Sequence, residues 1–86
     1  MPEICRFLGM IIRMYYDDHA PPHFHARYGD REAVIGIADL ACLKGGLPPK
    51  AMGLVIEWAS THRAELEEDW ALARQDLPLK TIAPLE

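Results

Sequence analysis

The sequence predicts an α+β fold: a small antiparallel sheet of about four strands, packed on one face by a long or broken C-terminal helix. Two observations support this prediction. Short segments rich in β-branched, aromatic and apolar residues fill the first forty positions, and from Pro49 onward apolar residues recur at three- and four-residue steps. The chain has 86 residues, 50% of them hydrophobic, which suits one domain with a single core. We expect that domain to span residues 1–76, followed by an extended tail over 77–86.

The expected strands are separated by segments that contain glycine or proline. They cover Glu3–Leu8, Met10–Tyr16, His23–Tyr28 and Arg31–Ile37. Gly29-Asp30 suits a two-residue hairpin turn with glycine first. Pro21-Pro22 marks the entry to the third strand, because proline cannot lie within a central strand. We expect Ala38–Pro48 to be a connector, in which a short strand or a turn is an alternative.

Side chains alternate along a strand, so residues two apart share a face. A turn at Gly29-Asp30 places Arg27 opposite Glu32, His25 opposite Val34 and Phe24 opposite Ile35. A turn at Leu8-Gly9 places Phe7 opposite Met10 and Cys5 opposite Ile12, although leucine is unfavourable where φ must be positive. If both hairpins join in one sheet, the helix covers its apolar face. The opposite face then presents Arg6, Arg13, Tyr15, His23, His25 and Arg27.

The C-terminal half predicts helix from Pro49 to about Gln75, with a break at Ser60-Thr61 as an alternative. Proline suits the first turn of a helix. One apolar stripe follows helical spacing through Met52, Val55, Ala59, His62, Leu66, Trp70 and Ala73. We expect Trp58 and Trp70 to anchor the core, and His62 to be a core histidine with its hydrogen bonds satisfied.

Charge and composition exclude several classes of protein. The net charge is −4, with six basic and six acidic residues in 1–50 but three basic and seven acidic residues in 51–86. This balance argues against loose binding to nucleic acid, but it allows a local cationic face on the first half. Neither a membrane-length apolar run nor a signal peptide is found in the sequence, and Cys5 and Cys42 are isolated. We therefore expect a cytoplasmic protein with free, buried thiols.

Three of the four histidines lie in the segment Asp17-Asp18-His19-Ala20-Pro21-Pro22-His23-Phe24-His25. One hypothesis is acid–base catalysis on a phosphodiester without a cofactor, as in a small ribonuclease, by His19, His23 and His25. Arg6, Arg13 and Arg27 would then contact phosphate, and Tyr15 would stack on a base.

A second hypothesis is a divalent metal site. His-x-His on a strand can present both imidazoles to one ion, so His23 and His25 are candidate ligands, with His19 or Asp17 adding another. A third hypothesis is structural: Asp18 and His19 cap the Pro-Pro turn, and the other two histidines fill a polar sheet face. The residues leave all three hypotheses open.

The chain also resembles a known family along almost its whole length. The residues that carry the resemblance are Ile4, Arg6-Phe7-Leu8-Gly9, Ile11-Ile12, Arg13-Met14-Tyr15-Tyr16, Asp18-His19-Ala20-Pro21-Pro22-His23-Phe24-His25, Leu47-Pro48-Pro49 and Glu57-Trp58-Ala59. They are similar to the bacterial domain-of-unknown-function family 4160. This resemblance implies a second small protein as partner, from domain-of-unknown-function family 2442. The pair looks like a type II toxin–antitoxin module, in which this chain would be the toxin. A non-enzymatic regulator that acts only through its partner is the alternative.

Overall fold

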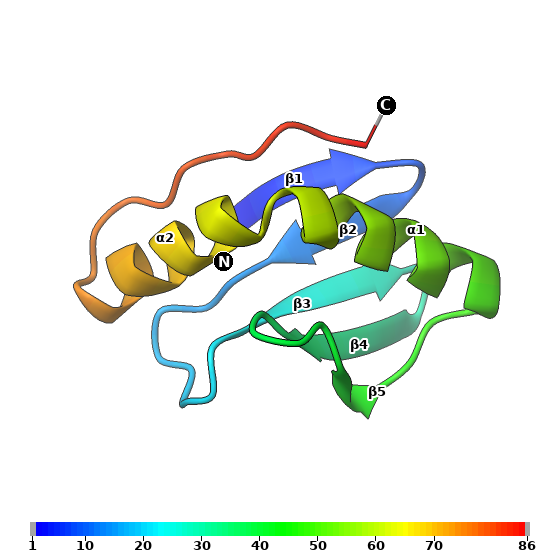
Figure 1. Cartoon of the computed structure of the whole chain (residues 1–86), viewed down its shortest axis with the longest axis horizontal. Coiled ribbons are helices and arrows are strands. Elements are labelled where there is room, and N and C mark those ends of the chain that lie inside the picture. The colour runs from blue at the N-terminus through cyan, green and yellow to red at the C-terminus, as the bar shows by residue number, and fades with distance from the viewer. Residues whose placement is uncertain (1, 86) are drawn as a thin grey trace.

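The computed structural model describes residues 2–85 and contains five strands followed by two helices (Figure 1). The elements are β1 (Glu3–Phe7), β2 (Met10–Arg13), β3 (His23–Tyr28), β4 (Arg31–Gly36), β5 (Cys42–Gly45), α1 (Pro49–Thr61) and α2 (Arg63–Arg74). The strands form one antiparallel sheet in the order β1-β2-β3-β4-β5. Both helices lie on one face of this sheet, as Figure 1 shows. The predicted α+β architecture is therefore confirmed.

The sheet has one strand more than the four we expected. β5 lies in the segment that we interpreted mainly as a connector, and it pairs with β4 through Ala33 opposite Gly45 and Val34 opposite Lys44. All four of its residues are exposed, so it lacks the apolar alternation that identifies a half-buried strand. β5 is therefore held in the sheet by its backbone pairing with β4 and not by burial of its side chains.

Both predicted hairpin registers are confirmed. Cys5 lies opposite Ile12 and Phe7 opposite Met10 in the first hairpin. In the second, Phe24 pairs with Ile35, His25 with Val34 and Arg27 with Glu32. The first turn places both Leu8 and Gly9 at positive φ, 48° and 83°, so leucine occupies the unfavourable conformation that the sequence pointed to.

The core lies between the helices and the apolar face of the sheet. Trp58 is fully buried, and its ring packs on Phe7 and Phe24 with centroid distances of 5.6 and 6.0 Å. Trp70 is also buried, so both tryptophans are core anchors as expected. Both cysteines are free, but only Cys5 is buried, and burial raises the pKa of its thiol. The expectation of a buried thiol was wrong for Cys42, because it belongs to the exposed strand β5.

The C-terminal helix is broken one residue later than the alternative we considered at Ser60-Thr61. His62 separates α1 from α2, with φ of −121°, and its backbone N–H donates to Ala59 O three residues earlier. Its side chain is half-buried against Trp58, and its Nδ1 lies 2.6 Å from Glu65 Oε1. His62 is therefore a hydrogen-bonded structural residue between the helices, as expected, but the expectation that it belongs to the core was wrong.

The C-terminal tail is extended and lies along β1 (Figure 1). The backbone N–H of Ile82 donates to Ile4 O at 2.8 Å, and Trp58 Nε1 donates to Ala83 O at 2.7 Å. Ile82 is buried in the core, and Asp69 on α2 accepts the backbone N–H of Lys80 at 2.9 Å. The tail thus covers the β1 edge of the sheet, which would otherwise expose unpaired backbone groups.

Asp69 makes the stability of this packing depend on pH. Burial raises the pKa of Asp69 above its ordinary value of 3.8, although the Lys80 N–H opposes this shift. Its Oδ2 is buried without a hydrogen-bond partner among the described residues. A raised folded-state pKa means that ionisation opposes folding, so this group's stabilisation is complete below pH 3.8 and is lost as pH rises through the raised value.

We expect Asp69→Asn to increase the free energy of unfolding at pH 7, because it removes a buried charge. The gain should shrink as the pH falls through the raised pKa of Asp69. Urea unfolding at a series of pH values measures both effects. Glu67→Gln, at an exposed acid on the same helix, is the control and should show no such trend. A pH-independent difference, or a loss of stability at pH 7, would contradict the expected charge effect.

Candidate functional site

The candidate site is formed where the loop between β2 and β3 returns to the start of β3. One carboxylate oxygen, Asp18 Oδ2, lies 3.1 Å from His23 Nε2 and 2.9 Å from His25 Nε2. His23 and His25 are on the same side of β3 because they are two residues apart. The three side chains are 11%, 15% and 23% exposed for His23, His25 and Asp18. We call these three residues the Asp18 cluster.

The hydrogen bond at the second ring nitrogen of His23 determines which ring nitrogen of the neutral imidazole carries the proton. His23 Nδ1 lies 2.7 Å from Pro21 O, which can only accept, so Nδ1 carries the proton of this bond. A neutral His23 therefore presents the lone pair of Nε2 toward Asp18. That lone pair and the carboxylate oxygen of Asp18 are both acceptors, so a bound cation between them would satisfy both atoms. A backbone carbonyl on the far nitrogen is also the usual support of a metal-binding histidine.

His25 is held mainly by neighbouring rings. The Tyr15 ring meets it edge-on with centroids 4.5 Å apart, and the His23 ring lies at 5.3 Å. Its Nδ1 is buried without a hydrogen-bond partner among residues 2–85, and the nearest carboxylate oxygen, Glu32 Oε2, lies at 3.8 Å. A small movement of Glu32 would give His25 the same kind of outer hydrogen bond that His23 already has.

The Asp18 cluster has the donor types of a metal site, and its two distances from Asp18 Oδ2 match the spacing of one. Its three ligand atoms lie within 4.8 Å of one another. Two ligands bound about 2.1 Å from one ion at angles of 90° to 109° are about 3.0 to 3.4 Å apart. The distances from Asp18 Oδ2 to the two imidazoles, 3.1 and 2.9 Å, agree with that separation to within a few tenths of an ångström.

The structure brings together some of the residues that the sequence pointed to and separates others. His23 and His25 lie in the Asp18 cluster, whereas His19 and Asp17 are exposed and belong to no donor group of this kind among the described residues. The carboxylate in the cluster is Asp18, which we had considered only as a turn cap. The two adjacent acids differ in which way the loop turns them. The signature that carries the family resemblance begins at Asp18 and leaves out Asp17, and this was the sequence signal that could have separated them.

The predicted anion-binding residues occupy the sheet face away from the helices. Arg13 lies opposite His25 in the pairing of β2 with β3. Arg27 donates to Gly29 O at 3.0 Å. Arg6 forms an ion pair with Glu3 at 2.8 Å, and this bond lowers the pKa of Glu3. Arg13 is therefore the basic residue placed best to contact an anion at His25.

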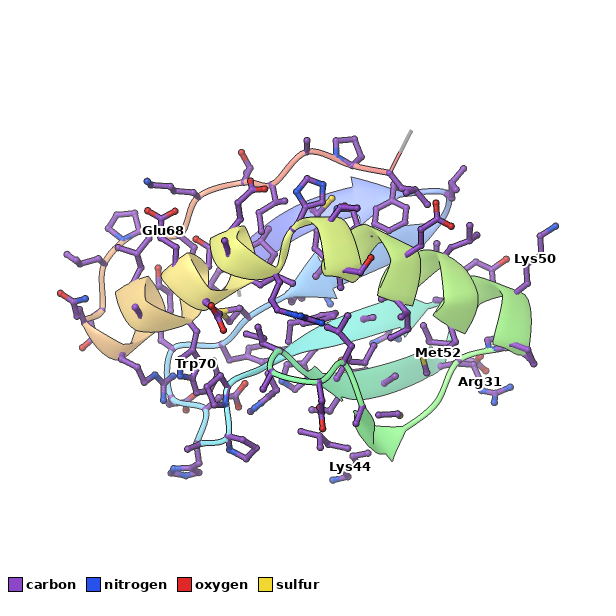
Figure 2. The ribbon with its side chains drawn as sticks, in the orientation of Figure 1. Arg31, Lys44, Lys50, Met52, Glu68 and Trp70 are labelled. Atoms are coloured by element: carbon purple, nitrogen blue, oxygen red, sulfur yellow. The ribbon has the colours of Figure 1, made fainter. Side chains whose placement is uncertain are left out.

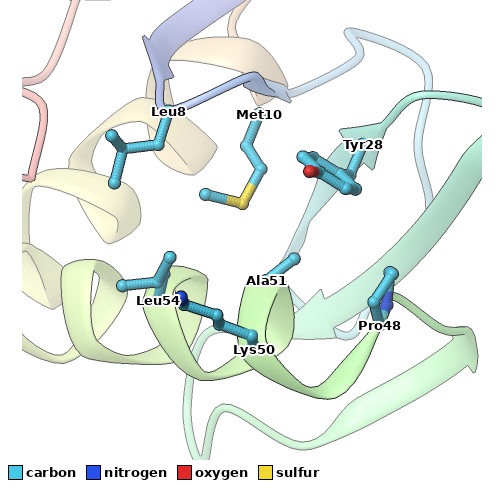
Figure 3. Close-up of a pocket in the computed structure, with 7 residues that line it drawn as sticks. All are labelled: Leu8, Met10, Tyr28, Pro48, Lys50, Ala51 and Leu54. Atoms are coloured by element: carbon cyan, nitrogen blue, oxygen red, sulfur yellow. The ribbon is translucent and has the colours of Figure 1, made fainter.

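A separate surface pocket lies away from the Asp18 cluster. It has a volume of about 490 Å³ and is formed by the first hairpin, β3 and the start of α1 (Figure 3). Its lining residues are Leu8, Met10, Tyr28, Pro48, Lys50, Ala51 and Leu54. Figure 2 shows Lys50 at the opposite end of the molecule from Trp70, which packs on His23. None of the histidines lines this pocket.

The fold and the site define a small α+β domain with a candidate His₂Asp centre. A family model described as domain of unknown function (DUF4160) matches residues 9–71. The protein belongs to this family, and the predicted resemblance is confirmed. No curated protein and no solved structure matches the chain. Neither helix of the described chain is long and apolar enough to cross a membrane.

Proposed function

We propose that this protein binds one divalent transition-metal ion through Asp18 Oδ2, His23 Nε2 and His25 Nε2. The observation that carries the proposal is the geometry of a single carboxylate oxygen, which faces two imidazole nitrogens at 3.1 and 2.9 Å. The Pro21 carbonyl supports it, because it directs the proton of a neutral His23 to the nitrogen away from the ion.

The donor set limits which ions fit. Two imidazoles and one carboxylate suit zinc, iron, cobalt or nickel better than calcium or magnesium, which prefer oxygen ligands. Three protein ligands leave coordination positions open for water or substrate, as in catalytic zinc sites and two-histidine, one-carboxylate iron sites. The proposed centre is therefore suited to exchange its remaining ligands.

Metal titration of the purified full-length protein tests this proposal. Isothermal titration with Zn²⁺ should give one site per chain, and Asp18→Asn should lower the affinity by more than 100-fold. We set this bound because loss of an outer hydrogen-bonding partner alone costs about 10- to 100-fold. Binding should also weaken in acid, because the ligands must be deprotonated.

A matched control distinguishes the Asp18 cluster from the ligand set expected from the sequence, in which His19 or Asp17 joins His23 and His25. His19→Ala changes an exposed histidine of the same loop, so it should leave the stoichiometry and affinity unchanged. Equal zinc affinity in Asp18→Asn and the unchanged protein would reject the site. Loss of binding in His19→Ala with retention in Asp18→Asn would instead support the ligand set expected from the sequence.

We propose as a second candidate that the same face acts on RNA, as the toxin of a toxin–antitoxin pair. The observation that favours this function is Arg13, a cation directly opposite His25 on the sheet face that the helices leave open. Phosphate could contact Arg13 while an imidazole of the cluster transfers a proton. A small protein that covers this face would then block the activity.

Expression in a bacterial host tests the second candidate. The protein should slow growth when it is produced without a partner, and His25→Ala or Arg13→Ala should relieve the effect. Circular dichroism of each purified variant confirms that it is folded. Full growth inhibition by a folded His25→Ala variant would exclude a role for this histidine in toxicity.

A further inference from the structure

We infer that Arg74 is the positioning residue of the proposed metal site, acting through Asp18 without contacting the ion. This inference rests on the metal-binding function proposed above. Arg74 is the last residue of α2 and lies 56 positions from Asp18 in the sequence. Its guanidinium reaches the loop between β2 and β3.

Arg74 binds three backbone carbonyls of that loop. Its Nη2 donates to Tyr16 O at 2.8 Å and to Tyr15 O at 3.3 Å, and its Nη1 donates to Asp18 O. The loop lacks regular structure between β2 and β3, so these bonds replace those of a strand or helix. Asp18 is therefore held at two places. Arg74 binds its backbone carbonyl, and its carboxylate contacts both histidines.

A second contact connects Arg74 with the histidine side of the cluster. The Arg74 guanidinium stacks on the Trp70 ring at 4.4 Å, one helical turn earlier. The Trp70 ring in turn packs on His23 with centroids 5.1 Å apart. Figure 2 shows Trp70 on the side of α2 that faces the loop between β2 and β3. The C-terminal end of α2 thus contacts the loop through Arg74 and the His23 ring through Trp70.

Arginine is suited to this position and lysine is not. Its planar guanidinium has five N–H donors in a fixed fork and stacks on an aromatic ring at the same time. A lysine ammonium is a compact charge on a flexible stem, so it cannot reproduce both contacts. A cation at the C-terminal end of a helix is also favoured by the helix dipole. Arg74→Lys therefore preserves the positive charge but removes the planar group that both binds the loop carbonyls and stacks on Trp70.

Titration with Co²⁺ tests the positioning role in the full-length protein. We expect Arg74→Lys to weaken Co²⁺ binding by about 10-fold and Arg74→Met by up to about 100-fold, the range for residues that orient metal ligands. The visible absorption of bound Co²⁺ should also change, because Asp18 no longer holds a fixed position. A residue that only stabilises the fold would not alter this spectrum in the folded protein.

Two controls separate positioning from general stability. Arg63→Met changes an exposed arginine at the start of the same helix and should leave Co²⁺ binding unchanged. Val55→Ala destabilises the core away from the loop, and its folded fraction should keep the original affinity and spectrum. In an Asp18→Asn background, Arg74→Lys should have little further effect, because both act on one ligand.

The outcomes distinguish this inference from the metal proposal itself. If the unchanged protein binds no Co²⁺ or Zn²⁺, the metal proposal fails and the role of Arg74 fails with it. If it binds Co²⁺ and folded Arg74→Lys has equal affinity and the same spectrum, only the positioning role is overturned. An additive effect of Arg74→Lys and Asp18→Asn would also overturn it, because Arg74 would then act by another route.

Discussion

Zn²⁺ at 100 times its dissociation constant is expected to increase the free energy of unfolding by about 2.7 kcal/mol, if only the folded protein binds the ion. For a domain of 86 residues this corresponds to a rise in the unfolding temperature of roughly 10 to 20 °C. The physical reason is that Asp18 joins His23 and His25 only when the loop between β2 and β3 is folded back on β3. Thermal unfolding with and without Zn²⁺ measures the shift.

The same measurement on variants shows whether the shift comes from the Asp18 cluster. Asp18→Asn and His25→Gln should lose most of the shift, whereas His19→Ala should keep it. Both cluster variants retain side chains of similar size that can hydrogen-bond, so the fold is expected to persist without metal. A full shift in either of them would show that zinc stabilises the protein from somewhere else.

Gly45→Ala is expected to lower the free energy of unfolding by about 3 kcal/mol. Gly45 has φ of +72°, a conformation that alanine adopts only with strain. An added Cβ would also overlap the carbonyl oxygen of Glu32 on the neighbouring strand β4. That oxygen accepts the backbone N–H of Gly46 at 3.0 Å, so the substitution also disturbs the bond that closes this end of β5.

The adjacent glycine provides the matched control. A Cβ at Gly46 would meet no heavy atom within 4 Å outside its chain neighbours, so Gly46→Ala should change stability by less than about 1 kcal/mol. Urea unfolding of the two variants gives the comparison. Equal stability of Gly45→Ala and Gly46→Ala would mean that β5 does not approach β4 as closely as the structure shows.

The two hairpins were predictable because alternation and turn chemistry agree. Gly29 and Gly9 provide positive φ in the turns, and the apolar residues around them alternate with period two. Only one register buries Phe24 opposite Ile35 and Phe7 opposite Met10, so a shifted pairing would expose the core. The sheet face that carries His25, Arg13 and Arg27 followed from that register.

β5 and the place of Asp18 in the cluster were missed for different physical reasons. β5 is defined by backbone pairing and a close glycine contact, and neither leaves an apolar pattern in the sequence. Asp18 is selected over Asp17 by the path of an irregular loop, which Arg74 stabilises from the far end of α2. A contact across 56 positions depends on the tertiary fold, and local sequence rules do not describe it.

The pocket at the start of α1 and the Asp18 cluster differ in the residues that form them. The pocket is lined mostly by apolar side chains, whereas the Asp18 cluster places ionisable groups within hydrogen-bonding distance of one another. The ionisable groups through which the protein could bind an ion are therefore gathered at the loop between β2 and β3. The clearest evidence for that conclusion would be direct observation of an ion.

Anomalous X-ray diffraction from crystals of the full-length protein grown with Zn²⁺ would show whether the Asp18 cluster binds the ion. We expect one strong anomalous peak about 2.0 to 2.2 Å from Asp18 Oδ2, His23 Nε2 and His25 Nε2. The Pro21 carbonyl should still accept the proton on His23 Nδ1. Zinc bound only at other residues, with Asp18 in direct hydrogen bonds to both histidines, would contradict it.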